Sequence, residues 1–240
     1  MFHSYILEHC SIRVKMVLMA TKAQRTERRT DALSKERIVE AAIEILDADG
    51  ESALTFRALA ARLATGSGAI YYHVTNKNDL LAAATNDVIA RVMTDVVSAA
   101  EPREAIRAIA LGVFDAIDAH PWVGAQLSRE PWQSAVLQIL EGFGGQLQAL
   151  GVPERAQFDC ASALVNYVLG LAGQYAAGAR LVPRGTDRSA FLATVAARWV
   201  QLDPAEYPFV HQVAAQLPEH DDREQFLAGI GLILAGIGTA

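Results

Sequence analysis

Apolar residues recur every three or four positions along most of the chain, which is the spacing of one face of an α-helix. Alternating apolar and polar positions bounded by turn residues, which would indicate strands, are missing. The pattern therefore predicts an all-α protein. Its first helices are short and its later ones are longer, so we expect a small three-helix head followed by a larger helical bundle.

Capping residues mark the ends of the short helices. Gly50 can adopt the left-handed conformation that ends a helix, because it has no Cβ. The Thr55 hydroxyl can accept a hydrogen bond from the free amides of the next turn. Asn76, with Asp79 three residues later, is typical of the capped start of a long helix. The expected helices span about residues 35–48, 55–63, 68–73 and 76–92.

The rest of the chain predicts longer helices separated by Gly and Pro. Gly151 closes one helix, and Pro153 opens the next, since proline in a first turn loses no hydrogen bond. We find no internal repeat and no low-complexity tract. The expected helices span about residues 103–119, a short segment after Pro121, 132–150, 153–180, 188–201, 209–217 and 222–238.

Composition supports a folded chain and gives no sign of a membrane span. Hydrophobic residues make up 52% and charged residues 20%, which is ample for a buried core and argues against disorder. Charges interrupt every apolar stretch before the ~18 residues that a spanning helix needs. Cys10 and Cys160 lack any C-x-x-C pairing, so a reducing, cytoplasmic setting is expected.

The charge is divided unevenly along the chain. The formal net charge of -6 argues against a protein that coats nucleic acid by bulk electrostatics. Residues 1–82 carry +1, however, and residues 83–240 carry -7, while residues 13–29 alone carry +5. This basic stretch is either a solvated tail or an arm that touches phosphate. We expect three parts: a flexible basic arm over 1–30, a head over 31–82 and a body over 83–240.

Two short helices joined by a tight glycine-containing turn and braced by a preceding helix form the outline of a helix-turn-helix. A helix that enters a major groove about 12 Å wide must present small or polar residues outward. Buried-core tyrosines are excluded as an alternative, because a short helix cannot hide three consecutive residues, Tyr71 to His73. The residues that we expect to face bases or phosphate are Thr55, Arg57, Gly68, Ala69, Tyr71, Tyr72, His73 and Lys77.

Residues 34–81 resemble the TetR family of one-component transcriptional repressors. The resemblance lies above all in Thr55-Phe-Arg-Ala-Leu-Ala and in Gly68-Ala-Ile-Tyr-Tyr-His-Val-Thr-Asn-Lys-Asn-Asp-Leu-Leu. It implies phosphate contacts by Tyr71 and Lys77. The helix at about 68–73, which would enter the groove, contains no Arg, Asn or Gln. Arg57, on the preceding helix, is therefore our candidate for direct guanine recognition. The resemblance implies base or backbone contacts by Arg57, Ser67, Gly68, Ala69, Tyr72 and His73.

The body resembles the tetracycline-repressor-like subgroup of this family through His120-Pro-Trp-Val, Pro131-Trp132 and Tyr207-Pro-Phe-Val. This resemblance implies a homodimer built from the helices at about 153–180 and 222–238. The sequence agrees, since the last helix is apolar around most of its circumference and must be covered. A core helix within a monomer is the alternative.

The same resemblance implies a small-molecule pocket among the central helices. An apolar wall with few polar groups suits an uncharged or weakly polar, fairly hydrophobic effector. Each aromatic candidate has core packing as its alternative, and Asn166 and Gln174 have interface hydrogen bonding. The His and Glu that bind a tetracycline–magnesium chelate in other members have no clear counterparts, so neither a metal nor a cofactor is expected. The candidates are Phe114, His120, Trp122, Gln126, Trp132, Phe143, Asn166, Tyr167, Leu171 and Gln174.

Together these features predict a ligand-responsive regulator that represses from a palindromic operator in double-stranded DNA until an effector releases it. A dimeric DNA-binding protein without an effector is the alternative, and activation in place of repression depends on where the operator lies. An enzyme is not expected. The sequence has no glycine-rich phosphate loop and no His/Cys/Asp set at metal spacing, and Cys160 has no histidine at a helical neighbour position.

Overall fold

The computed structural model describes residues 33–96, 101–130, 132–181 and 187–237. Every regular element in these ranges is helical, which confirms the all-α prediction. None of the helices in these ranges is both long enough and apolar enough to span a membrane. The basic arm expected over residues 1–30 lies outside the described residues.

The helices follow the expected order. The short segment predicted at 209–217 is divided into a helix and a 3-10 turn, and the helix predicted from 132 begins two residues later. The elements are α2 (Lys35–Asp49), α3 (Phe56–Arg62), α4 (Ser67–Tyr71), α5 (Lys77–Val96), α6 (Pro102–Ala119), α7 (Pro121–Arg129), α8 (Ser134–Ala149), α9 (Glu154–Leu181), α10 (Arg188–Trp199), α11 (Pro208–Ala214), η1 (Leu217–Glu219) and α12 (Asp222–Ile237).

The predicted caps form. Gly50 ends α2 with φ of 78°, and its amide donates to the Leu46 carbonyl at 3.1 Å. The Thr55 hydroxyl oxygen accepts from the Ala58 amide at 3.1 Å. At the start of α5 the Asp79 amide donates to Asn76 Oδ1 at 2.9 Å, and Asn76 Nδ2 donates to Asp79 Oδ2 at 3.1 Å. These short-range bonds fix where the head helices begin and end.

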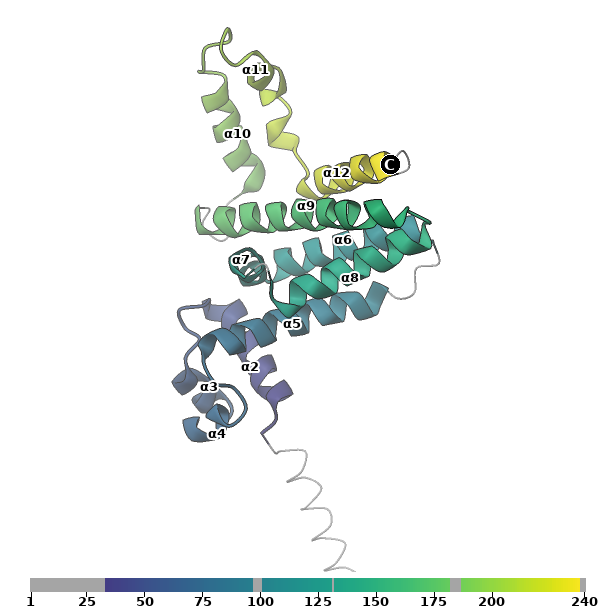
Figure 1. The fold of residues 1–240 in the computed structure, drawn as a ribbon. Coiled ribbons are helices and arrows are strands. Elements are labelled where there is room, and N and C mark those ends of the chain that lie inside the picture. The colour runs from purple at the N-terminus through teal and green to yellow at the C-terminus, as the bar shows by residue number, and fades with distance from the viewer. Residues whose placement is uncertain (1–32, 97–100, 131, 182–186, 238–240) are drawn as a thin grey trace, which may run out of the picture.

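The head consists of α2, α3 and α4, and α5 runs from it into the body (Figure 1). Its core contains Ile38, Leu46, Leu59 and Ile70, each at most 2% exposed. Each short helix therefore contributes one fully buried residue to the same hydrophobic core as the apolar face of α2. Because α5 belongs to both parts, a shift of α5 would move the head relative to the body.

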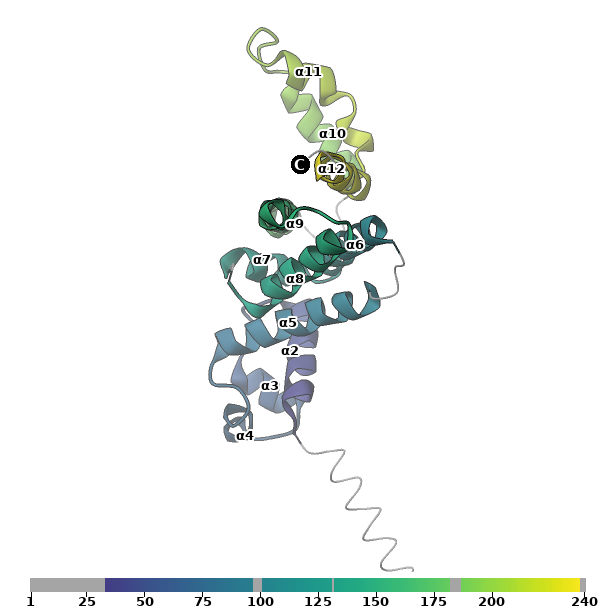
Figure 2. The ribbon, with the colours of Figure 1, turned by 45° about the vertical axis from the view of Figure 1, so that its right-hand side comes forward.

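The body is a stack of helices in which α8 lies between α5 and α9, with α6 beside it (Figure 2). Ile109 of α6, Phe143 of α8 and Leu164 of α9 are almost fully buried where these helices meet. The short helix α7 packs on α9 and also reaches the head.

The last helix, α12, packs closely on α6 and α9 through an aromatic stack. Phe226 lies between Phe114, at 5.0 Å between ring centroids, and Tyr167, at 5.4 Å. The Tyr167 ring covers Gly229, where a Cβ would collide with it. The Tyr167 hydroxyl donates to the Phe226 carbonyl at 3.3 Å, and burial raises the pKa of this phenol. The close approach of α12 to α9 therefore depends on the missing side chain at Gly229.

Candidate functional site

A left-handed residue makes the turn between α3 and α4. Ala64 has φ of 49° and is the one non-glycine residue with positive φ in the described part of the chain. The Thr65 amide donates to the Ala60 carbonyl at 2.9 Å, and the Ala64 amide donates to the Ala61 carbonyl at 3.3 Å. This pair of bonds is the Schellman motif, in which the left-handed position is usually glycine. The glycine in the turn, Gly66, instead caps α4 with φ of -84°.

One buried side chain anchors α4, and the remainder of the helix faces outward. Ile70 is fully buried, and Val74 just beyond the helix is 4% exposed. Gly68 and Ala69 are exposed, and Tyr72 is 88% exposed. The backbone at the start of α4 therefore has no bulky side chain in front of it, as close approach to a base edge requires.

The two tyrosines differ in their environment. The Tyr71 ring stacks on Phe56 of α3 with centroids 4.3 Å apart and planes 9° apart, and 54% of the residue stays exposed. Tyr72 meets His73 edge-on at 5.3 Å. Tyr71 is thus held in a fixed orientation at the junction of α3 and α4, while Tyr72 extends from the surface.

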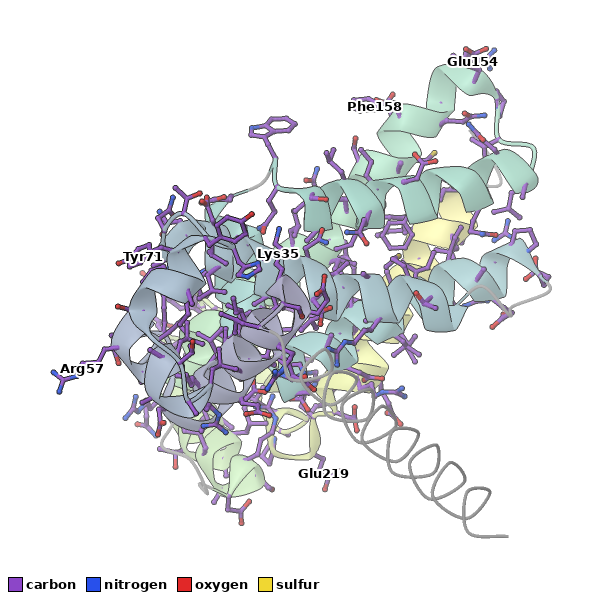
Figure 3. All side chains as sticks on the ribbon, turned by 90° about the horizontal axis from the view of Figure 1, so that it is seen from below. Lys35, Arg57, Tyr71, Glu154, Phe158 and Glu219 are labelled. Atoms are coloured by element: carbon purple, nitrogen blue, oxygen red, sulfur yellow. The ribbon has the colours of Figure 1, made fainter. Side chains whose placement is uncertain are left out.

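The first turn of α3 presents its residues on the same part of the head. Thr55 and Arg57 are both exposed. Arg57 extends away from the head, and Tyr71 lies on the same side of the molecule (Figure 3). Further along α3, Arg62 pairs with Glu44 at 2.6 Å and so braces α3 against α2.

Ser67 is the exposed first residue of α4, and Lys77 opens α5. Lys77 Nζ donates to the backbone carbonyl of Glu51 at 2.6 Å. This bond ties the start of α5 to the turn between α2 and α3, a role that the sequence did not predict. An ammonium has three donors, so its expected phosphate contact stays a prediction.

Asp47, near the end of α2, joins the head to the body. Its Oδ1 accepts from Trp122 Nε1 at 2.7 Å and lies 2.7 Å from His120 Nδ1. Both partners belong to the junction of α6 and α7. A carboxylate only accepts hydrogen bonds, so the His120 ring nitrogen donates here. The head is therefore held at a defined angle to α7.

Glu51 makes a second link two residues after α2. Arg129 of α7 donates to its two carboxylate oxygens at 3.2 and 3.1 Å, and Gln126 donates at 3.4 Å. The hydrogen bonds that Arg129 donates to Glu51 raise the pKa of its guanidinium. Sequence reasoning missed Asp47, Glu51 and Arg129. One available signal was the acidic C-terminal end of α2, where the helix dipole disfavours negative charge and the last turn has no basic residue.

The residues expected to bind an effector lie in several different settings, and a pocket among them stays a prediction. His120, Trp122 and Gln126 belong to the link with the head, because their polar atoms meet Asp47 and Glu51. The others fall into three groups. Phe114 and Phe143 are buried in the core, Tyr167 and Leu171 are partly buried on α9, and Trp132, Asn166 and Gln174 are exposed.

A pocket of about 530 Å³ lies elsewhere, between α5, α6 and α8. Met93, Ile109 and Leu137 give it apolar walls, and Gly142 leaves room on the α8 side. A Cβ at Gly142 would come within 3.1 Å of Met93 Sδ and 3.3 Å of Ile109 Cδ1. Its polar lining consists of Ser134, Gln138, Glu141 and Gln146. Among the residues that the structure describes, no group of three or more His, Cys, Asp or Glu could hold a metal ion.

The short helix α4 is anchored by one buried residue, is exposed elsewhere and is held by a tight turn against α3. This arrangement defines a helix-turn-helix protein, here with a helical C-terminal body. Comparison with known families agrees on both parts. Residues 38–84 match the bacterial regulatory proteins of the tetR family, and residues 100–240 match the tetracyclin repressor-like C-terminal domain. The chain therefore belongs to the TetR family, as the sequence predicted.

Two curated relatives are regulators. An HTH-type transcriptional regulator of Saccharopolyspora erythraea is 29% identical over 221 residues, covering 91% of this chain and 90% of that protein. The HTH-type transcriptional repressor DrrR1 of Streptomyces coeruleorubidus is 27% identical over 146 residues, covering 58% of this chain and 53% of that protein.

Solved structures agree on the fold. SCO7222, a TetR from Streptomyces coelicolor, has a TM-score of 0.76 and 52% identity, covering 86% of this chain and 98% of that one. ActR of the same organism, in complex with (S)-DNPA, has a TM-score of 0.70 and 23% identity, covering 86% and 98%. The protein is a DNA-binding transcriptional regulator, and its family consists of regulators, not enzymes.

Proposed function

We propose that the protein is a repressor that binds a palindromic operator as a homodimer and leaves it when a small, fairly hydrophobic effector binds. The observation that carries this proposal is the outward surface of α4, where Gly68 and Ala69 clear the backbone and Tyr72 projects from it. The head over 31–82 supplies DNA contacts, and the body over 83–240 supplies dimerisation and effector binding.

DNA contacts follow from the exposed side chains of α3 and α4. Arg57 reads guanine, because its guanidinium can donate two hydrogen bonds to O6 and N7. Tyr71 and Lys77 position the head on phosphates, as Thr55 does through the free amides of α3. Further residues of α4 and its end contact the DNA bases or the DNA backbone: Ser67, Gly68, Ala69, Tyr72 and His73.

The dimer uses the outer faces of α9 and α12. Leu232 of α12 is 76% exposed, and the small residues Ala228, Ala235 and Gly236 are exposed on the same helix. An apolar helix face of this kind is covered in a stable protein. Asn166 and Gln174, exposed on α9, can hydrogen-bond across the same interface.

The effector site is the pocket between α5, α6 and α8. Its apolar walls suit a hydrophobic ligand, and Met93 lies on α5, the helix that continues into the head. A ligand that binds one position of α5 better than another shifts the equilibrium between those positions and changes the separation of the two α4 helices. A structure of ActR contains actinorhodin, which supports ligand binding on this fold.

A dimeric DNA-binding protein without an effector is the second candidate. Phe114, Trp122 and Phe143, which we expected to line a ligand site, are at most 8% exposed and belong to the hydrophobic core of the body, which favours this candidate. The two candidates agree on DNA binding and differ only in whether a ligand changes it.

Operator binding is tested by selecting duplexes from a random double-stranded pool. The enriched sequence is expected to be a palindrome with half-sites about one helical turn (~10 bp) apart, because the two heads of a symmetric dimer read both halves. Failure to enrich any duplex, or enrichment of a single half-site only, would contradict the proposal.

The effector site is tested with a pair of glycines on α8. Gly142→Leu places a side chain against Met93 and Ile109 and fills the pocket, whereas a Cβ at Gly145 meets nothing within 4 Å. A ligand from a thermal-shift screen is expected to release wild-type protein and Gly145→Leu from the selected duplex but not Gly142→Leu. If no ligand in a broad library acts on the wild type, the effector-free candidate holds. Release of Gly142→Leu would exclude this pocket.

A further inference from the structure

The polar lining of the pocket between α5, α6 and α8 has a charge of one sign. α8 lies along α5 (Figure 1), and the polar side chains come from α8: Ser134, Gln138, Glu141 and Gln146. Glu141 is the charged member of this set. Within the described part of the chain, no Lys, Arg or His lines the pocket. The lining therefore offers a ligand a negative charge and no positive one.

The carboxylate of Glu141 is available to a ligand. The arginines of neighbouring helices are paired with acids on their own helix: Arg91 of α5 with Asp87, and Arg107 of α6 with Glu104. Glu141 is exposed, and it forms neither an ion pair nor a side-chain hydrogen bond with another described residue. An ionised carboxylate in this state can accept a charge-assisted hydrogen bond from an external donor.

Glu141 lies beside the apolar floor of the pocket. It directly precedes Gly142, so the two Cα atoms are about 3.8 Å apart. A Cβ at Gly142 would come within 3.1 Å of Met93 Sδ and 3.3 Å of Ile109 Cδ1. Leu137, one turn before Glu141, is 53% exposed and adds apolar surface. A ligand whose apolar body covers this floor therefore brings its end group close to a carboxylate.

The hydrogen-bonding capacity of the pocket suits a donor. Gln138 donates through Nε2 to Asn86 Oδ1 at 2.5 Å, so its other polar atom, Oε1, is an acceptor. The Glu141 carboxylate is also an acceptor only. A protonated amine carries N–H donors and a positive charge, and it matches both groups. An anion of the same shape would be repelled by Glu141.

The neighbouring hollow strengthens this preference. It measures about 510 Å³, lies between α2 and α5 and shares Ser134 with the pocket. Glu36, Asp79 and Asp87 line it, and Lys35 is the one cation among its described lining residues. Acidic groups along a cleft with low-dielectric walls attract cations and repel anions. The field around the pocket therefore favours a positively charged ligand.

We propose that the pocket binds a lipophilic amine, with its apolar body against Met93 and Ile109 and its protonated nitrogen donating to the Glu141 carboxylate. This inference rests on the proposed effector site and deepens it, because it names the charge of the ligand and the group that anchors it. An uncharged ligand of the same shape makes the apolar contact and lacks the ionic one.

Three probes that share one ring system test the charge preference. Naphthylmethylamine, naphthylmethanol and naphthoate are cationic, neutral and anionic near neutral pH, and isothermal titration calorimetry with the full chain measures their dissociation constants. The amine is expected to bind at least about fivefold more tightly than the alcohol, because it adds a charge-assisted hydrogen bond. Naphthoate should bind more weakly than both. The advantage of the amine should shrink as salt is added, since salt screens an exposed charge pair.

Two matched substitutions locate the charge. Glu141→Gln keeps the shape of the side chain and is expected to weaken amine binding at least about fivefold, while alcohol binding changes less than about twofold. Glu206→Gln removes the same charge at an exposed position outside the pocket and should leave binding of both probes unchanged. Equal losses of amine binding in the two variants would show a bulk charge effect and overturn the inference.

The outcomes separate this inference from the proposed effector function. Glu141-dependent binding of the amine that also releases the protein from the selected duplex supports both. Glu141-dependent binding without release supports the ligand class and contradicts the effector role of the pocket. Equal binding of amine and alcohol, or no binding of the amine, overturns the inference. The library screen with wild-type and Gly142→Leu protein then decides the effector site by itself.

Discussion

At the scale of single residues, the turn that orients α4 depends on a backbone conformation that L-residues avoid. Ala64 has φ of 49° and occupies the position of the Schellman motif that usually belongs to glycine. A left-handed conformation costs a non-glycine residue about 1–2 kcal/mol. The bonds made by Ala64 and Thr65 hold this conformation in place, so strain is stored directly before α4.

Ala64→Gly is expected to raise the free energy of unfolding by up to about 1 kcal/mol, because the relief of strain exceeds the added freedom of the unfolded chain, about 0.4–1 kcal/mol. Ala64→Val should lower it by more than about 1 kcal/mol, since a β-branched residue tolerates positive φ poorly. Urea titration followed by circular dichroism measures both. The control is Ala61→Gly inside α3, which should lose about 0.5–1 kcal/mol. A loss for Ala64→Gly equal to that of the control would contradict the role of the turn.

Arg57 and Arg62 lie on the same helix and both are exposed, but Arg62 forms an ion pair with Glu44 and, among the described residues, Arg57 forms none. Arg57→Ala is expected to weaken binding to the selected operator by about 1–3 kcal/mol and to relax the preference at one base pair, because a bidentate guanine contact is lost. Arg62→Ala removes a surface ion pair worth about 0–1 kcal/mol and should leave the base preference unchanged. Fluorescence anisotropy with operator variants measures both effects, and an unchanged base preference in Arg57→Ala would remove Arg57 from base recognition.

At the scale of elements, α7 is the piece that connects head and body. It packs on α9, its Trp122 and the preceding His120 each donate a hydrogen bond to Asp47, and its Arg129 binds Glu51. A movement of α9 or of the dimer face therefore reaches the end of α2 through side-chain contacts as well as through the continuous backbone of α5. The head has two attachments, and its orientation depends on both.

Asp47→Ala is expected to lower the free energy of unfolding by about 1–3 kcal/mol, because the Trp122 indole and the His120 ring lose their shared acceptor in a part-buried place. Asp49→Ala is the matched control, since Asp49 is exposed at the same helix end and its removal relieves an unfavourable dipole contact. Its change should stay within about 0.5 kcal/mol. Both are measured by urea titration at equal chain concentration, and similar losses would mean that Asp47 does not tie the head to the body.

The helices and their ends could be predicted because the signals are local. Gly50, Thr55 and Asn76 act on amides and carbonyls within one turn, so the sequence contains both partners of each bond. Asp47 and Trp122 are 75 residues apart in the chain, and no periodicity relates them. For the same reason the sequence identified His120 and Trp122 as candidate residues but could not predict their contacts with Asp47. The pocket beside Met93 depends on how three helices pack, which periodicity does not specify.

At the scale of the whole molecule, the charge is distributed unevenly along an elongated shape. The head lies at one end of the molecule, and α10 and α11 lie at the other (Figure 1). The acidic body, with -7 over residues 83–240, is repelled by phosphate, while residues 13–29 carry +5. This asymmetry favours an approach to DNA with the head first and limits adhesion through other faces.

Deletion of residues 1–30 is expected to flatten the salt dependence of operator binding. Each lost phosphate contact reduces the slope of log K against log salt by about 0.9. We expect a reduction of at least about 2, with the operator preference unchanged, because backbone contacts carry no sequence information. Anisotropy titrations between about 50 and 200 mM salt measure the slope. An unchanged slope would identify the basic stretch as a solvated tail.

The hydrogen bond between Trp122 and Asp47 also gives the protein an internal optical probe. The chain has three tryptophans, and they differ in access to water: Trp122 is 8% exposed, Trp199 is partly buried and Trp132 is 87% exposed. A soluble quencher such as iodide quenches the fluorescence of the exposed Trp132 indole first. The emission that survives comes largely from an indole whose N–H is bonded to a carboxylate of the head, so its wavelength follows that bond. Binding of DNA or of a ligand can then be watched from the joint between head and body without attaching a dye.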